Sequence, residues 1–130
     1  MNVIEEIKAR LQKYPQARYE FGKRWIRVLP ACDKGFAVEL IAGRNRSEVY
    51  FKGWHESFAD PEEAFNCFAF GLSSDCRLRV FQRGSFEYNW TVEYNEEGEW
   101  IEDSTTGLFL IPFWRRKGIV YLQNNLLSGY

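Results

Sequence analysis

The one histidine of this chain, His55, stands between Trp54 and Glu56 at the end of a strand pattern. An imidazole can act as a general base near neutral pH, and a carboxylate can orient it. Neighbouring residues on an extended strand point to opposite faces, so Glu56 is badly placed to hold the ring of His55. A catalytic pair would need a carboxylate from elsewhere, and the candidates are Asp60, Glu102 and Asp103. We therefore expect no catalytic residue and place His55 at a solvated strand end.

A ligand pocket is the alternative use of these residues. Rings and a few polar groups that converge on one cavity are typical of small-molecule sites. The hydroxyls and carboxylates of a later turn could complete such a pocket, although they also stabilise turns by bonding their own backbone. The candidate pocket residues are Trp54, His55, Glu56, Asp103 and Thr105.

A second candidate site is the basic and aromatic stretch that contains Trp114, Arg115, Arg116 and Lys117. Tryptophan and arginine are favoured anchors of protein interfaces, and they could equally stack on bases and neutralise phosphates in a single-stranded nucleic acid. A solvated basic turn has the same sequence. Further arginines could extend this surface, namely Arg44, Arg46, Arg77, Arg79 and Arg83.

No residue pattern predicts a metal or cofactor site. The cysteines Cys32, Cys67 and Cys76 are odd in number and have no C-x-x-C spacing, which disfavours a zinc site and a disulfide framework. Cys67 and Cys76 fall on apolar faces and are expected to pack, whereas Cys32 lies in a turn. The acidic residues of 96–103 lack the alternating oxygen pattern of calcium loops.

Composition narrows the function classes. The formal net charge is −1, so a long-range field suited to phosphate backbones is not expected, and we rank protein contact above nucleic acid. The longest apolar run, 108–114, is far too short for a membrane span. The first ten residues lack the layout of a signal peptide, and with the cysteine usage they favour the cytoplasm. The chain has 23 aromatic residues (11 Phe, 7 Tyr and 5 Trp), which suit a β-rich fold.

The first half of the chain predicts a helix, three strands and a second helix. Apolar residues recur at helical spacing over 2–14, with Asn2 and Glu5 at capping-box distance. Strand patterns follow at 18–29, 36–42 and 47–54. Asp60 and Pro61 then start a helix over 61–75 that is apolar on nearly every side. Such a helix should be covered by the sheet on one side and by a second layer or an oligomer contact on the other.

The second half predicts short antiparallel strands. In 86–94 apolar and polar residues alternate, and in the preceding strand Leu78 and Val80 alternate with arginines. A two-residue turn at Gly84 and Ser85 would pair Val80, on the core face of one strand, with Asn89, on the solvent face of the next. We therefore predict a three-residue loop that pairs Val80 with Trp90, Leu78 with Val92, Arg77 with Glu93 and Arg83 with Glu87.

These patterns predict a single α+β domain over 1–130, built on a mainly antiparallel sheet of about seven to eight strands in the order α-βββ-α-ββββ(β). Order alone gives no function. The ring content, the apolar second helix and the basic-aromatic stretch favour a non-enzymatic interaction module that holds a protein partner or its own copy. The alternatives are a small-ligand binder or small enzyme with a pocket near His55, and, third, a single-strand nucleic-acid binder.

Overall fold

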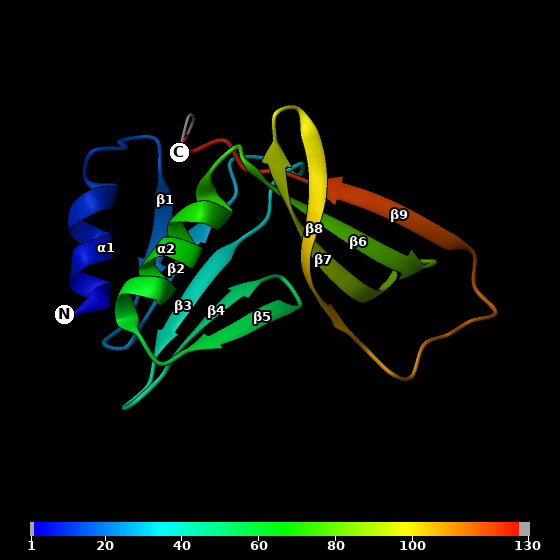
Figure 1. The fold of residues 1–130 in the computed structure, drawn as a ribbon, viewed down its shortest axis with the longest axis horizontal. Coiled ribbons are helices and arrows are strands. Elements are labelled where there is room, and N and C mark those ends of the chain that lie inside the picture. The colour runs from blue at the N-terminus through cyan, green and yellow to red at the C-terminus, as the bar shows by residue number, and fades with distance from the viewer. Residues whose placement is uncertain (1, 128–130) are drawn as a thin grey trace.

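The computed structural model describes residues 2–127, which form two helices and nine strands in two antiparallel sheets (Figure 1). The helices are α1 (Val3–Leu11) and α2 (Pro61–Leu72). The first sheet contains β1 (Arg18–Phe21), β2 (Trp25–Leu29), β3 (Val38–Ala42), β4 (Ser47–Phe51) and β5 (Trp54–Phe58). The second contains β6 (Cys76–Arg83), β7 (Phe86–Glu96), β8 (Glu99–Gly107) and β9 (Lys117–Leu122). The predicted α+β class and the antiparallel pairing are confirmed.

The first sheet has five strands where the sequence predicts three, because two of the predicted strands are hairpins. Residues 18–29 turn at Gly22, whose N–H bonds the carbonyl of Trp25 across 2.9 Å. The strand predicted over 47–54 turns at Lys52 and Gly53, so it covers β4 and only the first residue of β5, which continues to Phe58. Lys52 has a positive φ of 57°, a conformation that glycine and asparagine adopt more readily. A lysine at this position therefore does not indicate a turn.

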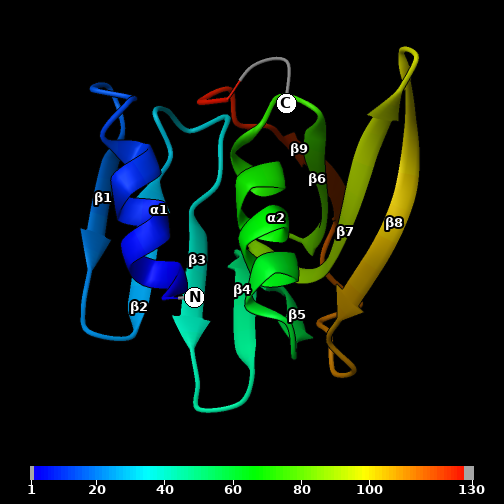
Figure 2. The same cartoon turned by 60° about the vertical axis from the view of Figure 1, so that its left-hand side comes forward.

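Both helices cover one face of the first sheet and lie side by side on it (Figure 2). The side chain of Asn2 caps α1 by accepting from the N–H of Glu5, and Asp60 caps α2 by accepting from the N–H of Glu62. The apolar surroundings predicted for α2 are present, since α1, the first sheet and β6 all contact it. No helix among residues 2–127 is long and apolar enough to cross a membrane.

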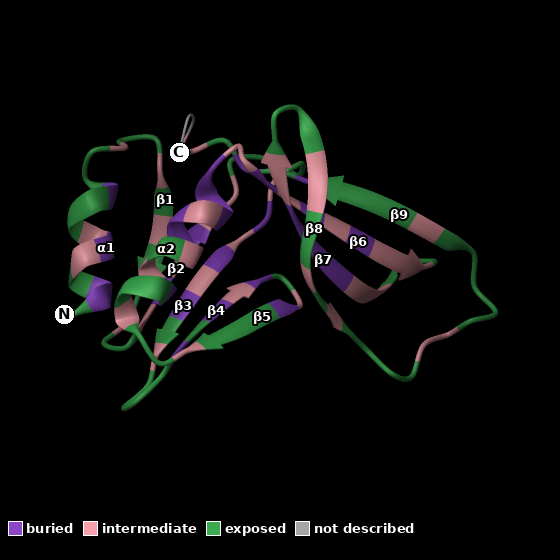
Figure 3. Cartoon of the chain, in the orientation of Figure 1, coloured by how far each residue is buried: buried purple, intermediate pink, exposed green. Residues whose placement is uncertain are grey.

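The second sheet packs its inner face against the first sheet and α2. This face carries Leu78, Val80, Trp90 and Val92, all buried (Figure 3). Gly53 allows the close approach, because a β-carbon there would lie 2.4 Å from the indole of Trp90. The outer face of the sheet carries the alternate residues of the same strands, among them Arg77, Arg79, Thr91 and Glu93.

The strand register predicted for β6 and β7 is confirmed, but the predicted loop is wrong. Val80 pairs with Trp90, Leu78 with Val92 and Arg77 with Glu93. The turn is nevertheless short, and Arg83 pairs with Phe86 instead of Glu87. A β-bulge at Tyr88 supplies the extra residue that exchanges the faces, which the sequence argument assigned to the loop.

The segment after β9 returns to the first half of the chain. The side-chain amide of Asn124 accepts from the N–H of Phe36 at 3.0 Å and donates to the carbonyls of Phe36 and Gly71 at 3.0 and 2.9 Å. Leu127 then bonds the carbonyl of Leu72. These bonds join the segment after β9 to α2 and to the connection between β2 and β3.

Candidate functional site

Three of the five candidate pocket residues, Trp54, Glu56 and Asp103, line one cavity of about 530 Å³ between β5, α2 and the second sheet. Glu56 reaches it because it pairs with Val49 on the helix-facing side of the first sheet. Asp103 lies at the β-bulge of β8. The other residues that line the cavity are Phe51, Phe58, Asn66, Cys67, Phe70, Asp75, Val92, Tyr94 and Asn95.

The remaining two candidates lie elsewhere. His55 pairs with Tyr50 on the solvent face of the first sheet, where the two rings lie 5.4 Å apart. Its Nδ1 lies 3.4 Å from the carbonyl of Gly53, and no bond joins it to a carboxylate among the described residues. Thr105 lies on the outer face of the second sheet, with its hydroxyl 2.8 Å from that of Thr91. The cavity therefore has no imidazole.

The cavity is acidic and open to solvent, since Glu56 and Asp103 are both exposed. Partial burial, and then the charges of Asp103 and Glu63, raise the pKa of Glu56 above its ordinary value of 4.5. Burial also raises the pKa of the Cys67 thiol to about 12, so this thiol is protonated and a poor nucleophile near neutral pH. The residues that line the cavity include three carboxylates and no lysine or arginine. This arrangement suits a cationic group better than covalent catalysis.

The second predicted site, Trp114 to Lys117, lies in and just after the loop that joins β8 to β9, residues 108–116 (the β8–β9 loop). Figure 1 shows this loop reaching away from both sheets. Phe109 is 97% exposed, Leu110 81%, and Phe113 and Trp114 72% each. Backbone hydrogen bonds anchor the loop near its two ends, where the N–H of Leu108 donates to the carbonyl of Tyr88 and the N–H of Gly84 donates to the carbonyl of Arg116.

Four cations gather beside this apolar loop: Arg83, Arg115, Arg116 and Lys117. Arg83 donates to the carbonyl of Arg115 at 3.4 Å, and Lys117 is paired with Arg83 across β6 and β9. None of the four forms an ion pair within residues 2–127. The site thus joins exposed rings to positive charge that the described chain leaves unneutralised.

The proposed extension of this surface holds only for Arg83. Arg44 and Arg46 lie in the turn between β3 and β4 of the first sheet. The side chain of Arg46 donates to Ser57 of β5. Arg77 and Arg79 lie on the outer face of the second sheet but are held by carboxylates of the same sheet.

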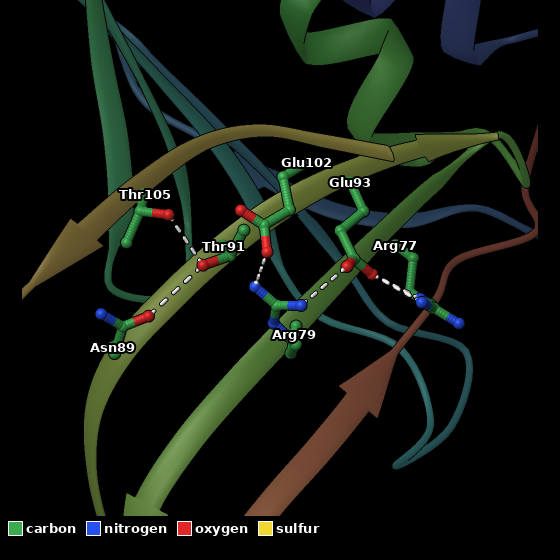
Figure 4. A network of polar contacts seen from close by, with 7 residues as sticks. All are labelled: Arg77, Arg79, Asn89, Thr91, Glu93, Glu102 and Thr105. Atoms are coloured by element: carbon green, nitrogen blue, oxygen red, sulfur yellow. Dashed lines mark hydrogen bonds and ion pairs between the residues drawn. The ribbon is translucent and has the colours of Figure 1, made fainter. Parts of the chain in front are cut away.

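A polar network on the outer face was missed by the sequence reasoning (Figure 4). Glu93, whose side chain is 4% exposed, accepts from Arg77 at 2.7 Å and from Arg79 at 3.2 Å, and Arg79 also binds Glu102. The bond to Glu102 is the first cause of a raised pKa at Arg79. The arginine alternation in β6 opposite the glutamate of β7 was the available signal, read only as a favourable pairing on a solvent face.

Two aromatic rings that lie against the guanidinium of Arg77 complete this network. The guanidinium of Arg77 lies 4.6 Å from the ring of Trp100 and 4.3 Å from that of Tyr121. Arginine held between rings and a buried carboxylate is rigid, so this part of the outer face is a preformed surface.

Within residues 2–127 no group of three or more histidine, cysteine or acidic side chains is placed to hold a metal ion. The chain matches no protein-family model, no curated protein and no solved structure.

Proposed function

We propose that this chain is a non-enzymatic interaction module that holds a protein partner or its own copy through the β8–β9 loop and the cations beside it. The observation that carries the proposal is the exposure of Phe109, Leu110, Phe113 and Trp114, which are each at least 72% exposed, whereas the other large apolar side chains of residues 2–127 are at most 50% exposed. Soluble domains rarely leave contiguous apolar groups in water without a use for them.

The energetics support a contact surface. Burying one such side chain is worth about 1.5–3 kcal/mol, so four of them supply about 6–12 kcal/mol, which is comparable with the roughly 4–15 kcal/mol that association costs in entropy. The rings of Phe113 and Trp114 are packed edge to face at 5.5 Å, which fixes part of the surface before binding. Arg115 and Arg116 follow directly and supply the charged rim typical of binding anchors.

Charge ranks the partner classes. A net charge of −1 gives the whole molecule no attraction for a phosphate backbone, so a protein partner ranks above a single-stranded nucleic acid. Placement in the cytoplasm belongs to the same proposal, and the free cysteines Cys32, Cys67 and Cys76 support it.

A photocrosslinking amino acid at Phe109 tests the proposal. Purified protein alone and protein in a lysate are irradiated, and the same residue at Asn45, in the exposed turn between β3 and β4, serves as the control. We expect a crosslinked product at Phe109 that is lost with Leu110→Ser and Trp114→Ser and is absent at Asn45. No product in either sample, or the same product at both positions, contradicts the proposal.

The cavity lined by Trp54, Glu56 and Asp103 favours a second candidate function, the binding of a small cationic ligand. Its carboxylates and aromatic walls suit an alkylammonium or guanidinium group. Spermidine, arginine and tetramethylammonium are the probes, and thermal unfolding is the readout. We expect a stabilisation that Asp103→Asn removes, and unchanged melting with every probe rules this candidate out.

A further inference from the structure

The outer face of the second sheet combines apolar exposure with a preformed polar centre. Helix α2 and strand β5 of the first sheet contact this sheet from its inner side. On the outer side Ile119 is 48% exposed and Tyr121 50%, and Phe86 at the β6–β7 turn is 41% exposed. The network around Glu93 lies among them, with the Glu93 carboxylate bonded by Arg77 and Arg79, while the buried Nε of Arg79 has no hydrogen-bond partner among the described residues. The face therefore resembles an interface, where rings and arginine are enriched.

Opposite charges gather at the two ends of this sheet. The chain directions place Arg83, Arg115, Arg116 and Lys117 where β6 ends and β9 begins. The hairpin between β7 and β8, at the other end, carries Glu96 and Glu99, both exposed and without an ion pair in the described chain. Since β7 has 11 residues, the two ends are separated by about 30 Å.

Such a face is complementary in charge to its own copy. In a twofold pair every contact occurs twice, so antiparallel stacking would place the basic end of each subunit on the acidic end of the other. Parallel stacking would instead oppose like charges. We propose that two copies of this chain associate through the outer faces of their second sheets, with the strands of one copy antiparallel to those of the other.

This inference rests on the proposed function and names the partner as a second copy. In the antiparallel pair, the β8–β9 loop of one copy extends from its basic end over the acidic end of the other, where Trp100 lies on the outer face. The loop residues Phe109 and Leu110 would then lose their exposure in the dimer.

Charge exchange tests the arrangement. One variant carries Arg115→Glu and Arg116→Glu, and the other carries Glu96→Lys and Glu99→Lys. All four positions are exposed, so folding should be unaffected, and circular dichroism checks it. In sedimentation velocity we expect the wild type to dimerise and each variant alone to dimerise more weakly by roughly tenfold or more. An equimolar mixture should recover the dimer, because both contacts are again between opposite charges.

Ile119→Lys tests the face itself. Ile41→Lys is the matched control, since Ile41 is 41% exposed on the solvent face of the first sheet. Only Ile119→Lys should weaken the dimer. A wild type that stays monomeric, variants that dimerise as well as the wild type, or a mixture that fails to associate overturns the inference. A monomer that still crosslinks to another protein at Phe109 would leave the proposed function standing, whereas a monomer without such a product would remove both.

Discussion

The indole N–H of Trp54 donates a 3.0 Å hydrogen bond to the hydroxyl of Ser104, and this bond joins β5 of the first sheet to β8 of the second. Trp54 is almost fully buried and stacks on Phe51 with ring centroids 4.6 Å apart. Ser104→Ala would leave the buried indole donor without an acceptor. We expect this variant to lose about 1–2 kcal/mol of unfolding free energy in urea titrations.

The matched control is Ser57→Ala on the same strand as Trp54. Ser57 is exposed and accepts only from Arg46. Its loss should change the unfolding free energy by less than about 0.5 kcal/mol. Equal effects of the two variants would show that the bond between the sheets has no special weight.

Glu93 is the anchor of the outer-face network, so its removal should be costly. Glu93→Gln leaves the guanidinium groups of Arg77 and Arg79 without the carboxylate that holds both. We expect a loss of about 2–4 kcal/mol, measured by urea unfolding. Glu102→Gln removes a carboxylate that is 61% exposed, and it should cost less than about 1 kcal/mol. The reverse ranking would contradict the buried position of Glu93.

Gly71 brings the backbone of α2 close to Phe51 of the first sheet. A β-carbon there would lie 2.4 Å from the ring of Phe51, which is fully buried and cannot move away freely. Gly71→Ala should therefore destabilise the protein by about 1–3 kcal/mol in thermal or urea unfolding. At Gly118 in β9 a β-carbon would meet Gln82 at an ordinary 3.5 Å, so Gly118→Ala should be nearly neutral. If Gly118→Ala were the more harmful change, the packing described at Gly71 would be wrong.

Glu56 gives the cavity a pH signature. Its pKa is raised in the folded protein, so the folded state binds its proton more tightly than the unfolded chain does. Stability linked to this group is then highest below about pH 4.5 and decreases as the pH rises through the raised pKa. Glu56→Gln should be more stable than the wild type at pH 7 and equal to it near pH 4. Urea titrations across this range measure the difference.

Asp103→Asn removes the second cause of the raised pKa and should reduce the pH dependence in part. A stability difference between Glu56→Gln and the wild type that is larger at pH 4 than at pH 7 would contradict the direction of the shift.

Local signals in the sequence were sufficient for the helices and for one register. Asn2 and Asp60 cap the helices as predicted, because capping depends on neighbours within a single turn. The pairing of Val80 with Trp90 could be derived because the alternation of faces leaves few registers. The bulge at Tyr88 could not be derived from the sequence. An extra residue exchanges the two faces of the strand whether it lies in the strand or in the turn.

The candidate site was predictable only in part, for the same reason. Trp54, Glu56 and Asp103 come together through the packing of two sheets, which no local pattern records. The face assignment of His55 and Glu56 followed from strand geometry alone. The exposure of the β8–β9 loop was also hidden, because an apolar run such as 108–114 is the usual sign of a buried strand.

The bonds of Asn124 have a consequence for how this molecule is made. The first sheet is built from strands that follow one another along the chain, so it could assemble early from near neighbours, whereas in the second sheet β9 pairs with the more distant β6. The hydrogen bonds of Asn124 to Phe36 and Gly71, however, depend on a residue that follows β9. During synthesis the contacts of β5 with β7 and β8 can therefore form first, and the bonds of Asn124 to Phe36 and Gly71 are added only when the segment after β9 has emerged.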